Sequence, residues 1–186
     1  MIVLGLDPGS CESALVEWDT IRKRPLYRAK LGNAAVFAAL ADRADAHVLV
    51  VESTTAYTLP GGAASRFMPQ QILETAEWVG QFCRCWQHEL GGSLERLDRR
   101  KVKLHLLGRA SGTDAHVRAA LLDLIGPQGT KAAPGPTYGM RADLWAALAV
   151  AFVWHEKHQQ ARAVSAPAAN DVGRASPVGS GDDRPF

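Results

Sequence analysis

Cysteine is scarce in this chain, and its spacing argues against a structural zinc site. The 186 residues include three cysteines, Cys11, Cys83 and Cys85. The last two are separated by one residue, whereas zinc-binding pairs are usually separated by two or more. An odd number of cysteines without metal-finger spacing is typical of a reduced protein, so we expect a cytoplasmic location.

Long apolar runs are also lacking. No apolar stretch approaches the ~20 residues that a membrane-spanning helix needs. The first apolar run is short and is broken by Asp7 and Pro8, which argues against a secretory signal peptide. From the short apolar runs we expect no membrane partner.

The histidines give no clear metal signal, and we expect His105, which lies in an apolar segment, to pack in the core.

Charge and length set modest limits. The net charge is +2 and hydrophobic residues make up 47% of the chain, as in an ordinary globular protein. The length allows one good core, so we expect one domain over residues 1–160. Ala, Ser, Pro, Gly and Asp dominate afterwards, which predicts a disordered tail over residues 161–186. Basic residues cluster within 22–30 and 96–103. Taken alone, either cluster predicts solvated loops and strand edges. Together with a metal site, the two clusters would suit a polyanionic partner.

The order of the expected elements is that of an α/β protein. Two alternating segments joined by a short basic turn predict an antiparallel hairpin, and strands then alternate with helices. We expect a mixed five-stranded sheet, with three antiparallel strands first and helices on both faces. The expected strands span residues 2–6, 13–19, 26–31, 48–51 and 102–107, and the expected helices span about 33–43, 70–90, 113–124 and 140–157.

Two of these strands end in a carboxylate. Asp7 follows the apolar run 2–6, and Glu52 follows the apolar run 48–51. Unpaired carboxylates next to one another repel and are costly to bury. Because Mg²⁺ prefers hard oxygen ligands, a divalent cation would remove that cost. The pattern predicts a metal-dependent site for phosphate chemistry.

A third carboxylate, Asp143, lies near the start of the last expected helix. It shares one helical face with Ala146, Ala147 and Val150. Small residues on this face allow close packing against a sheet, which would point Asp143 toward the other two acids. The alternative is that Asp143 is a first-turn acid that interacts favourably with the helix dipole.

Together, these motifs resemble those of the RuvC-type Holliday-junction resolvases, and more closely those of a phage and prophage branch of that family. The resemblance implies an RNase H-like fold and covers roughly residues 1–158. It rests on Gly5-Leu6-Asp7-Pro8-Gly9-Ser10, on Val50-Val51-Glu52 and on the apolar helix that begins at Asp143. Further similar stretches are residues 74–82, 103–106, 114–121, 129–131 and 134–139.

The resemblance implies roles for individual residues. Asp7 matches the metal ligand of the first strand, Glu52 matches the glutamate of the central strand, and Asp143 matches the first acid of the final-helix motif. These three would bind two divalent ions, Mg²⁺ or Mn²⁺. The bacterial enzymes carry a second acid where this chain has Ala146. Asp114 is the candidate for the missing fourth catalytic acid, and the alternative is that Asp114 caps its helix.

The same resemblance implies branched DNA, a four-way junction above all, as the partner, and a homodimer that cuts two symmetric strands. Such DNA would be recognised by shape and backbone rather than by base edges. The candidate dimer face is the apolar stripe of Trp78, Phe82 and Trp86. Candidate DNA-contacting residues are Tyr57, Arg66 and Phe67 in the long loop after Glu52, and Arg109, Arg118 and Lys131 elsewhere; the alternative is ordinary loop packing or surface charge.

We therefore expect a crossover junction endodeoxyribonuclease, a Mg²⁺-dependent hydrolase of branched DNA, in the bacterial cytoplasm or in a phage-infected host cell. Actin-like ATPases and sugar kinases begin with a similar strand and aspartate, but they need two such domains, and this chain is too short. An RNase H-like nuclease that acts on forks or RNA–DNA hybrids is a second alternative. A junction-binding protein that does not cleave is the third, because of Ala146.

Overall fold

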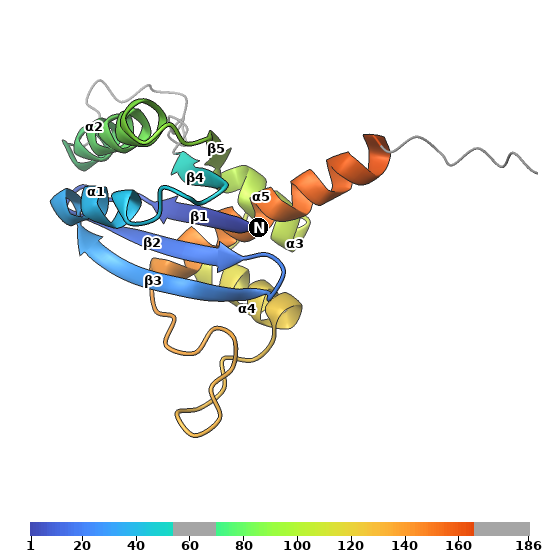
Figure 1. Ribbon diagram of the computed structural model, residues 1–186. Coiled ribbons are helices and arrows are strands. Elements are labelled where there is room, and N and C mark those ends of the chain that lie inside the picture. Colours follow the sequence, from blue (N-terminus) through green and yellow to red (C-terminus); the bar gives the residue numbers. More distant parts are fainter. Residues whose placement is uncertain (54–69, 166–186) are drawn as a thin grey trace, which may run out of the picture.

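The computed structural model describes residues 1–53 and 70–165, which are built around one five-stranded sheet. The strand order is β3-β2-β1-β4-β5 (Figure 1). β1 (Ile2–Asp7), β2 (Glu12–Asp19) and β3 (Arg24–Gly32) are antiparallel neighbours. β4 (Val48–Ser53) is parallel to β1, and β5 (Leu94–Asp98) is parallel to β4. The predicted mixed sheet with three antiparallel strands first is confirmed.

One face of the sheet is covered by α1 (Asn33–Ala41) and α2 (Gln70–Arg84), and a π-helical turn, η1 (Cys85–Glu89), continues α2 (Figure 1). Phe82 and Trp86 are fully buried in the core on this face. The prediction that the apolar stripe of α2 is left uncovered for a partner is therefore wrong for these two side chains. Trp78 stays partly exposed and stacks on Phe82, with 5.9 Å between ring centroids.

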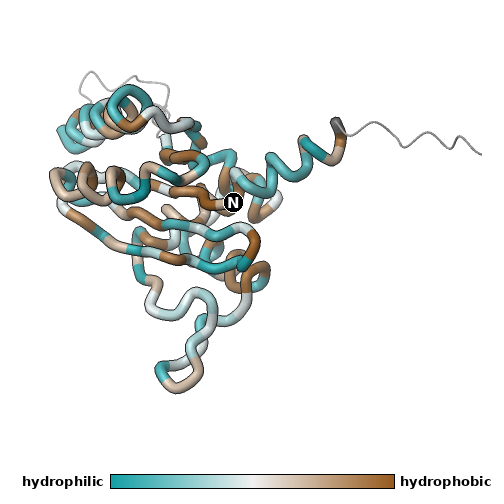
Figure 2. Tube along the Cα trace, in the orientation of Figure 1, coloured by the Kyte–Doolittle hydropathy of each residue, from teal (hydrophilic) through white to brown (hydrophobic). Residues whose placement is uncertain are grey.

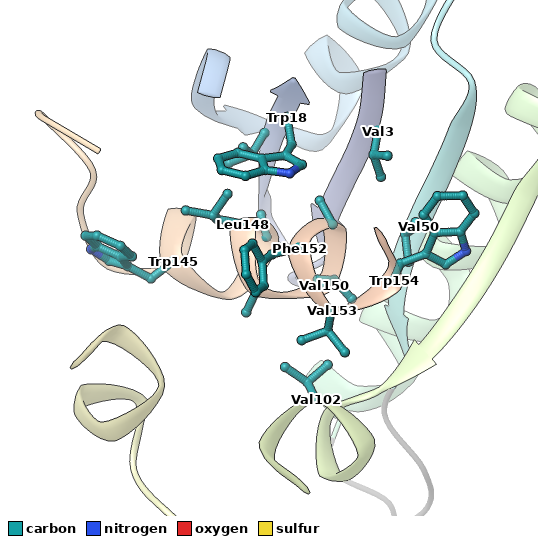
Figure 3. Packing of buried hydrophobic residues seen from close by; sticks show 14 of the residues in the cluster. Val3, Trp18, Val50, Val102, Trp145, Leu148, Val150, Phe152, Val153 and Trp154 are labelled. Carbon is teal, nitrogen blue, oxygen red and sulfur yellow. The ribbon is translucent and has the colours of Figure 1, made fainter. Parts of the chain in front are cut away.

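The other face of the sheet is covered by α5 (Leu144–Ser165), with α3 (Arg99–Leu107) and α4 (Asp114–Ile125) beside it. Figure 3 shows Leu148 and Phe152 of α5 beside Trp18 of β2. α5 lies directly on β1, as shown by Gly5, where a methyl group would overlap the backbone carbonyl of Ala147. The absence of a side chain at Gly5 thus allows the helix to approach the strand that carries Asp7 this closely.

The fifth strand is not where the sequence predicts it. Residues 102–107 form part of α3, which takes His105 into a helix, and β5 lies at 94–98 instead. Asp98 caps α3 by accepting a hydrogen bond from the amide of Arg100 at 2.7 Å, and Gly108 ends the helix in the left-handed conformation. β5 is an edge strand in which Leu97 is the one buried residue, so its sequence carries little of the apolar signal of a strand.

α5 begins later and ends later than predicted. It starts at Leu144, after a turn that includes Asp143, and continues to Ser165. Its apolar first half packs on the sheet, whereas its polar second half extends beyond it (Figure 2). Residues 161–165, expected to begin the disordered tail, are therefore helical, and residues 166–186 lie outside the described residues. Within the described part of the chain, no helix is both long and apolar enough to cross a membrane.

Candidate functional site

Asp7 and Glu52 lie side by side where two parallel strands end. β1 and β4 are paired through Leu6 and Val51, so the next residue of each strand is an acid. Both acids point to the face that α5 covers, because side chains alternate along a strand and Val50 belongs to the core on that face. Glu52 is 7% exposed. The predicted neighbourhood of these two carboxylates is confirmed.

A small buried network holds the turn that follows Asp7. Ser13 Oγ donates to Asn33 Oδ1 at 2.7 Å, and Asn33 Nδ2 donates to the carbonyl of Gly9 at 3.0 Å. The amide of Gly9 in turn donates to Ser13 Oγ at 3.3 Å. Asn33 is the first residue of α1 and does not cap this helix, because Gly32 occupies the cap position. The side chain of Asn33 instead fixes the backbone next to the first catalytic candidate.

The electrostatics of Asp7 and Glu52 favour the presence of a cation. The pKa of Asp7 is raised from 3.8 to about 8, mainly by burial and further by a hydrogen bond to Glu52 and by the charge of Glu52. Asp143 adds to this effect, whereas Arg99 opposes it. At neutral pH Asp7 therefore keeps its proton when no cation is present, because two adjacent carboxylates repel when both are ionised.

Arg99, the first residue of α3, bridges two acids across the site. Its Nη1 donates to Glu52 Oε2 at 3.3 Å, and its Nη2 donates to Asp114 Oδ1 at 2.6 Å. The side chain of Arg99 is 35% exposed, so part of the guanidinium group faces solvent. This guanidinium supplies positive charge between a strand end and the start of α4.

Asp143 is brought to the same site but is turned toward the opposite edge. Its Oδ2 lies 2.8 Å from Lys30 Nζ on β3, and the same ammonium group lies 3.4 Å from Glu12 Oε2. The side chain of Asp143 is 49% exposed. The prediction that Asp143 lies on the buried face of the last helix is wrong, because Ala142 has a φ of 40° and a turn precedes α5.

Asp114 does not cap its helix. Thr113 is the N-cap of α4, and its side chain accepts a hydrogen bond from the amide of His116 at 3.4 Å. The carboxylate of Asp114 is 74% exposed and is paired with Arg99 instead. The capping alternative is therefore wrong, while the role of Asp114 as a fourth catalytic acid stays a prediction.

These side chains line a cleft of about 330 Å³. A second hollow of about 450 Å³ adjoins it on the side of α2, and both are lined by Asp7, Glu52 and Arg99. These three residues therefore stand between the two hollows and face both. Ala146, the position at which the resemblance to the bacterial resolvases leads us to expect a second acid, also lines the first hollow. The first hollow is further lined by Val102, Lys103, Asp114, Val117, Ala142, Asp143, Trp145 and Ala149.

The donor set fits a divalent metal ion in part. Asp7 and Glu52 offer adjacent hard oxygen ligands whose shared negative charge is only partly offset by Arg99. Within residues 1–53 and 70–165, however, no three Asp, Glu, His or Cys side chains are grouped closely enough to hold a metal ion as they lie. Asp143, the third predicted ligand, lines the same cleft but is paired with Lys30.

The described DNA-contacting candidates lie around the cleft or beyond it. Arg118 of α4 stands 5.3 Å over the ring of Trp145, which lines the cleft. Lys131 is exposed in the connection between α4 and α5, which projects away from the sheet (Figure 1). Arg109 is exposed just after α3. Tyr57, Arg66 and Phe67 lie outside the described residues.

Three bases of the site are not assigned a role by the sequence. Lys103 lines the cleft and donates to the carbonyl of Gly112 at 2.7 Å, while Arg99 and Lys30 pair with the acids. All three belong to the basic clusters at 22–30 and 96–103. The signal that could have identified Arg99 is Asp98, because aspartate often caps a helix. A helix that starts after Asp98 places the end of the preceding strand next to Arg99.

Comparisons with solved structures support the fold. RuvC of Thermus thermophilus is similar with a TM-score of 0.65 and 18% identity, over 87% of this chain and 97% of that one. The structure of T. thermophilus RuvC in complex with Holliday junction substrate gives a TM-score of 0.64 and 18% identity, over 87% and 96% of the two chains. No family model and no curated protein sequence matches the chain. The chain therefore has the RuvC fold, and its place in a phage branch stays a prediction.

Proposed function

We propose that this chain is a metal-dependent, structure-selective endonuclease that cuts four-way DNA junctions, as a crossover junction endodeoxyribonuclease does. The observation that carries the proposal is the adjacent pair of acids at the ends of β1 and β4, where burial and Glu52 raise the pKa of Asp7 to about 8. An acidic pair that is buried and only partly compensated by Arg99 costs stability. Such a cost is typical of functional sites.

Asp7, Glu52 and Asp143 would hold the metal, Mg²⁺ or Mn²⁺, with two ions in each site. When bound, divalent ions activate the attacking water and stabilise the charge that develops on the phosphate. The chain itself supplies the rest. The network around Asn33 holds the turn after Asp7, and the bases at the cleft neutralise the backbone of the substrate.

The DNA would follow the cleft and contact the basic residues around it. Arg118, Lys131 and Arg109 are the described candidates for phosphate contacts. Because such contacts release counterions, the affinity for DNA should fall steeply with salt. T. thermophilus RuvC has been seen in complex with a Holliday junction substrate, which supports the same class of substrate here. A homodimer would place two such clefts on two symmetric strands.

The substrate class is tested by a panel of labelled DNAs. We expect Mg²⁺-dependent cleavage of a mobile four-way junction, with a linear duplex left intact at the same enzyme concentration. A Y-fork and an RNA–DNA hybrid test the alternative of a nuclease with another substrate. Preferential cleavage of the hybrid would replace the proposal by that alternative, and tight junction binding without any cleavage would favour a binding protein.

A further inference from the structure

Arg99 and Asp114 form a charged pair on the wall of the cleft. We propose that Arg99 binds a backbone phosphate of the DNA beside Asp7 and Glu52, and that Asp114 positions Arg99 instead of holding a metal ion. This inference rests on the proposed nuclease function, and it assigns a substrate contact within that site. It also assigns Asp114 a different role: Asp114 holds an arginine in place and does not bind a metal ion.

The position of Arg99 suits a phosphate contact. Arg99 lines both hollows, together with Asp7 and Glu52. A DNA strand that reaches the two acids from either hollow therefore comes next to this guanidinium group. The side chain is 35% exposed, so its remaining donors can reach a ligand. The planar fork of an arginine matches the oxygens of a phosphate, which is a reason for Arg at such a place.

The contacts of Asp114 suit a positioning role. Its Oδ1 lies 2.6 Å from Arg99 Nη2, so the carboxylate is engaged in a short, charge-assisted hydrogen bond. Thr113 and His116 fix the start of α4 through a capping box, which holds the backbone of Asp114 in place. Lys103 ties α3 to the carbonyl of Gly112, just before α4. α3 and the segment before α4 are thus tied together by contacts of the chain itself.

The second contact of Arg99 gives the inference a distinctive signature. Arg99 Nη1 lies 3.3 Å from Glu52 Oε2, so the guanidinium group and a metal ion at Asp7 and Glu52 would compete for the same negative charge. Loss of Arg99 should therefore strengthen metal binding while it weakens cleavage. A residue that merely supports the structure would weaken both when it is removed.

The test measures metal affinity and cleavage separately. Isothermal titration of the DNA-free chain with Mn²⁺ gives the metal affinity, and single-turnover cleavage of a four-way junction gives the rate at saturating Mg²⁺. Arg99→Ala should bind Mn²⁺ more tightly, by about threefold or more, because a competing cation is gone. Its cleavage rate should fall about 100-fold, as when a donor to a developing negative charge is lost.

Asp114→Asn separates a positioning residue from a ligand. We expect its Mn²⁺ affinity to stay within about twofold and its cleavage rate to fall about tenfold, because Arg99 is less well held. In the double variant Arg99→Ala/Asp114→Asn, the second change should add nothing to the loss, since Asp114 acts through Arg99. Arg84→Ala, which removes an exposed ion pair with Glu89 away from the cleft, should change neither quantity.

Three results would overturn the inference. One is a loss of Mn²⁺ affinity of about tenfold or more in Asp114→Asn, which is the range expected for a disturbed metal site. Another is cleavage by Arg99→Ala at the rate of the unmodified chain. The third is additive losses in the double variant. If the unmodified chain cuts no junction, the proposed function fails, and the titration of Asp114→Asn still decides whether Asp114 is a ligand.

Discussion

Asp7→Asn should stabilise the metal-free chain. In the folded state, burial and the neighbouring Glu52 raise the pKa of Asp7 from 3.8 to about 8. An ionised Asp7 is therefore disfavoured by folding at neutral pH. Asparagine is neutral in the folded and unfolded states, so it removes this cost. Its amide can still donate a hydrogen bond to Glu52.

The size of the effect follows from the pKa shift. At pH 7, keeping a carboxyl group with an unfolded pKa of 3.8 protonated costs at most about 4 kcal/mol. Removing this cost stabilises the variant. An amide donates a weaker hydrogen bond to Glu52 than a carboxylic acid does, which reduces the stabilisation. We expect a net increase of about 2 kcal/mol in the free energy of unfolding, or roughly 4–8 °C in Tm for a chain of this size.

The effect has a defined dependence on pH. The acid form of Asp7 stabilises the folded chain fully below pH 3.8, and this stabilisation is lost as the pH rises toward about 8. Asp7→Asn does not lose it. The difference in Tm between Asp7→Asn and the unmodified chain should therefore be smallest near pH 4, grow with pH and level off above about pH 8.

Thermal denaturation in EDTA and in Mg²⁺ tests this prediction. Mg²⁺ should raise the Tm of the unmodified chain, because a ligand that binds the folded state stabilises it, and should leave Asp7→Asn unchanged. Asp123→Asn, which removes an exposed carboxylate outside the cleft, controls for the change of net charge. A lower Tm for Asp7→Asn than for the unmodified chain at pH 8 in EDTA would refute the reasoning.

Other predictions concern the support of the site and its chemistry. Asn33→Ala should lower the free energy of unfolding in urea by about 2 kcal/mol, because buried groups lose their hydrogen-bond partner; an unchanged midpoint would contradict this. Gly5→Ala should cost on the order of 1–3 kcal/mol, because the methyl group overlaps α5, whereas the control Gly80→Ala, which meets open space, should not destabilise the chain. Glu52→Gln and Asp143→Asn should each lower junction cleavage at least ~100-fold, with junction affinity in gel shifts largely unchanged; near-normal cleavage by either variant would exclude it as a ligand.

The central acids could be predicted because their sequence signal is local and the geometry of a sheet does the rest. An apolar run that ends in Asp7 and another that ends in Glu52 place both acids at strand ends. Parallel neighbouring strands end at the same edge of a sheet, so the two acids must meet there. The pairing of β1 with β4 confirms this step.

The fifth strand could not be placed by apolar periodicity. Residues 102–107 alternate apolar and polar side chains at first, which is typical of a strand, yet the capping residues Asp98 and Gly108 enclose a helix. The strand itself lies at the edge of the sheet and needs few apolar residues. A strand predicted at residues 102–107 offers no reason to expect Arg99 beside Glu52.

The surroundings of Asp143 depend on contacts between distant parts of the chain. Lys30 belongs to β3 and meets Asp143 only because the sheet and the turn before α5 bring them together. The positive φ of Ala142 is equally invisible in the sequence, since alanine rarely adopts it. Helical periodicity alone therefore predicts Asp143 inside the helix and on its buried face, whereas α5 starts one residue later, at Leu144.

The central claim is that Asp7 and Glu52 form a metal-dependent site for cutting branched DNA. Its most direct test is to map the cuts in each strand of a mobile four-way junction, with the unmodified chain and with Glu52→Gln, in Mg²⁺ and in EDTA. We predict paired nicks at symmetric positions in two opposing strands, only in Mg²⁺ and only with Glu52 present. Nicks that persist in EDTA or with Glu52→Gln, or a junction left intact by the unmodified chain in Mg²⁺, would contradict the claim.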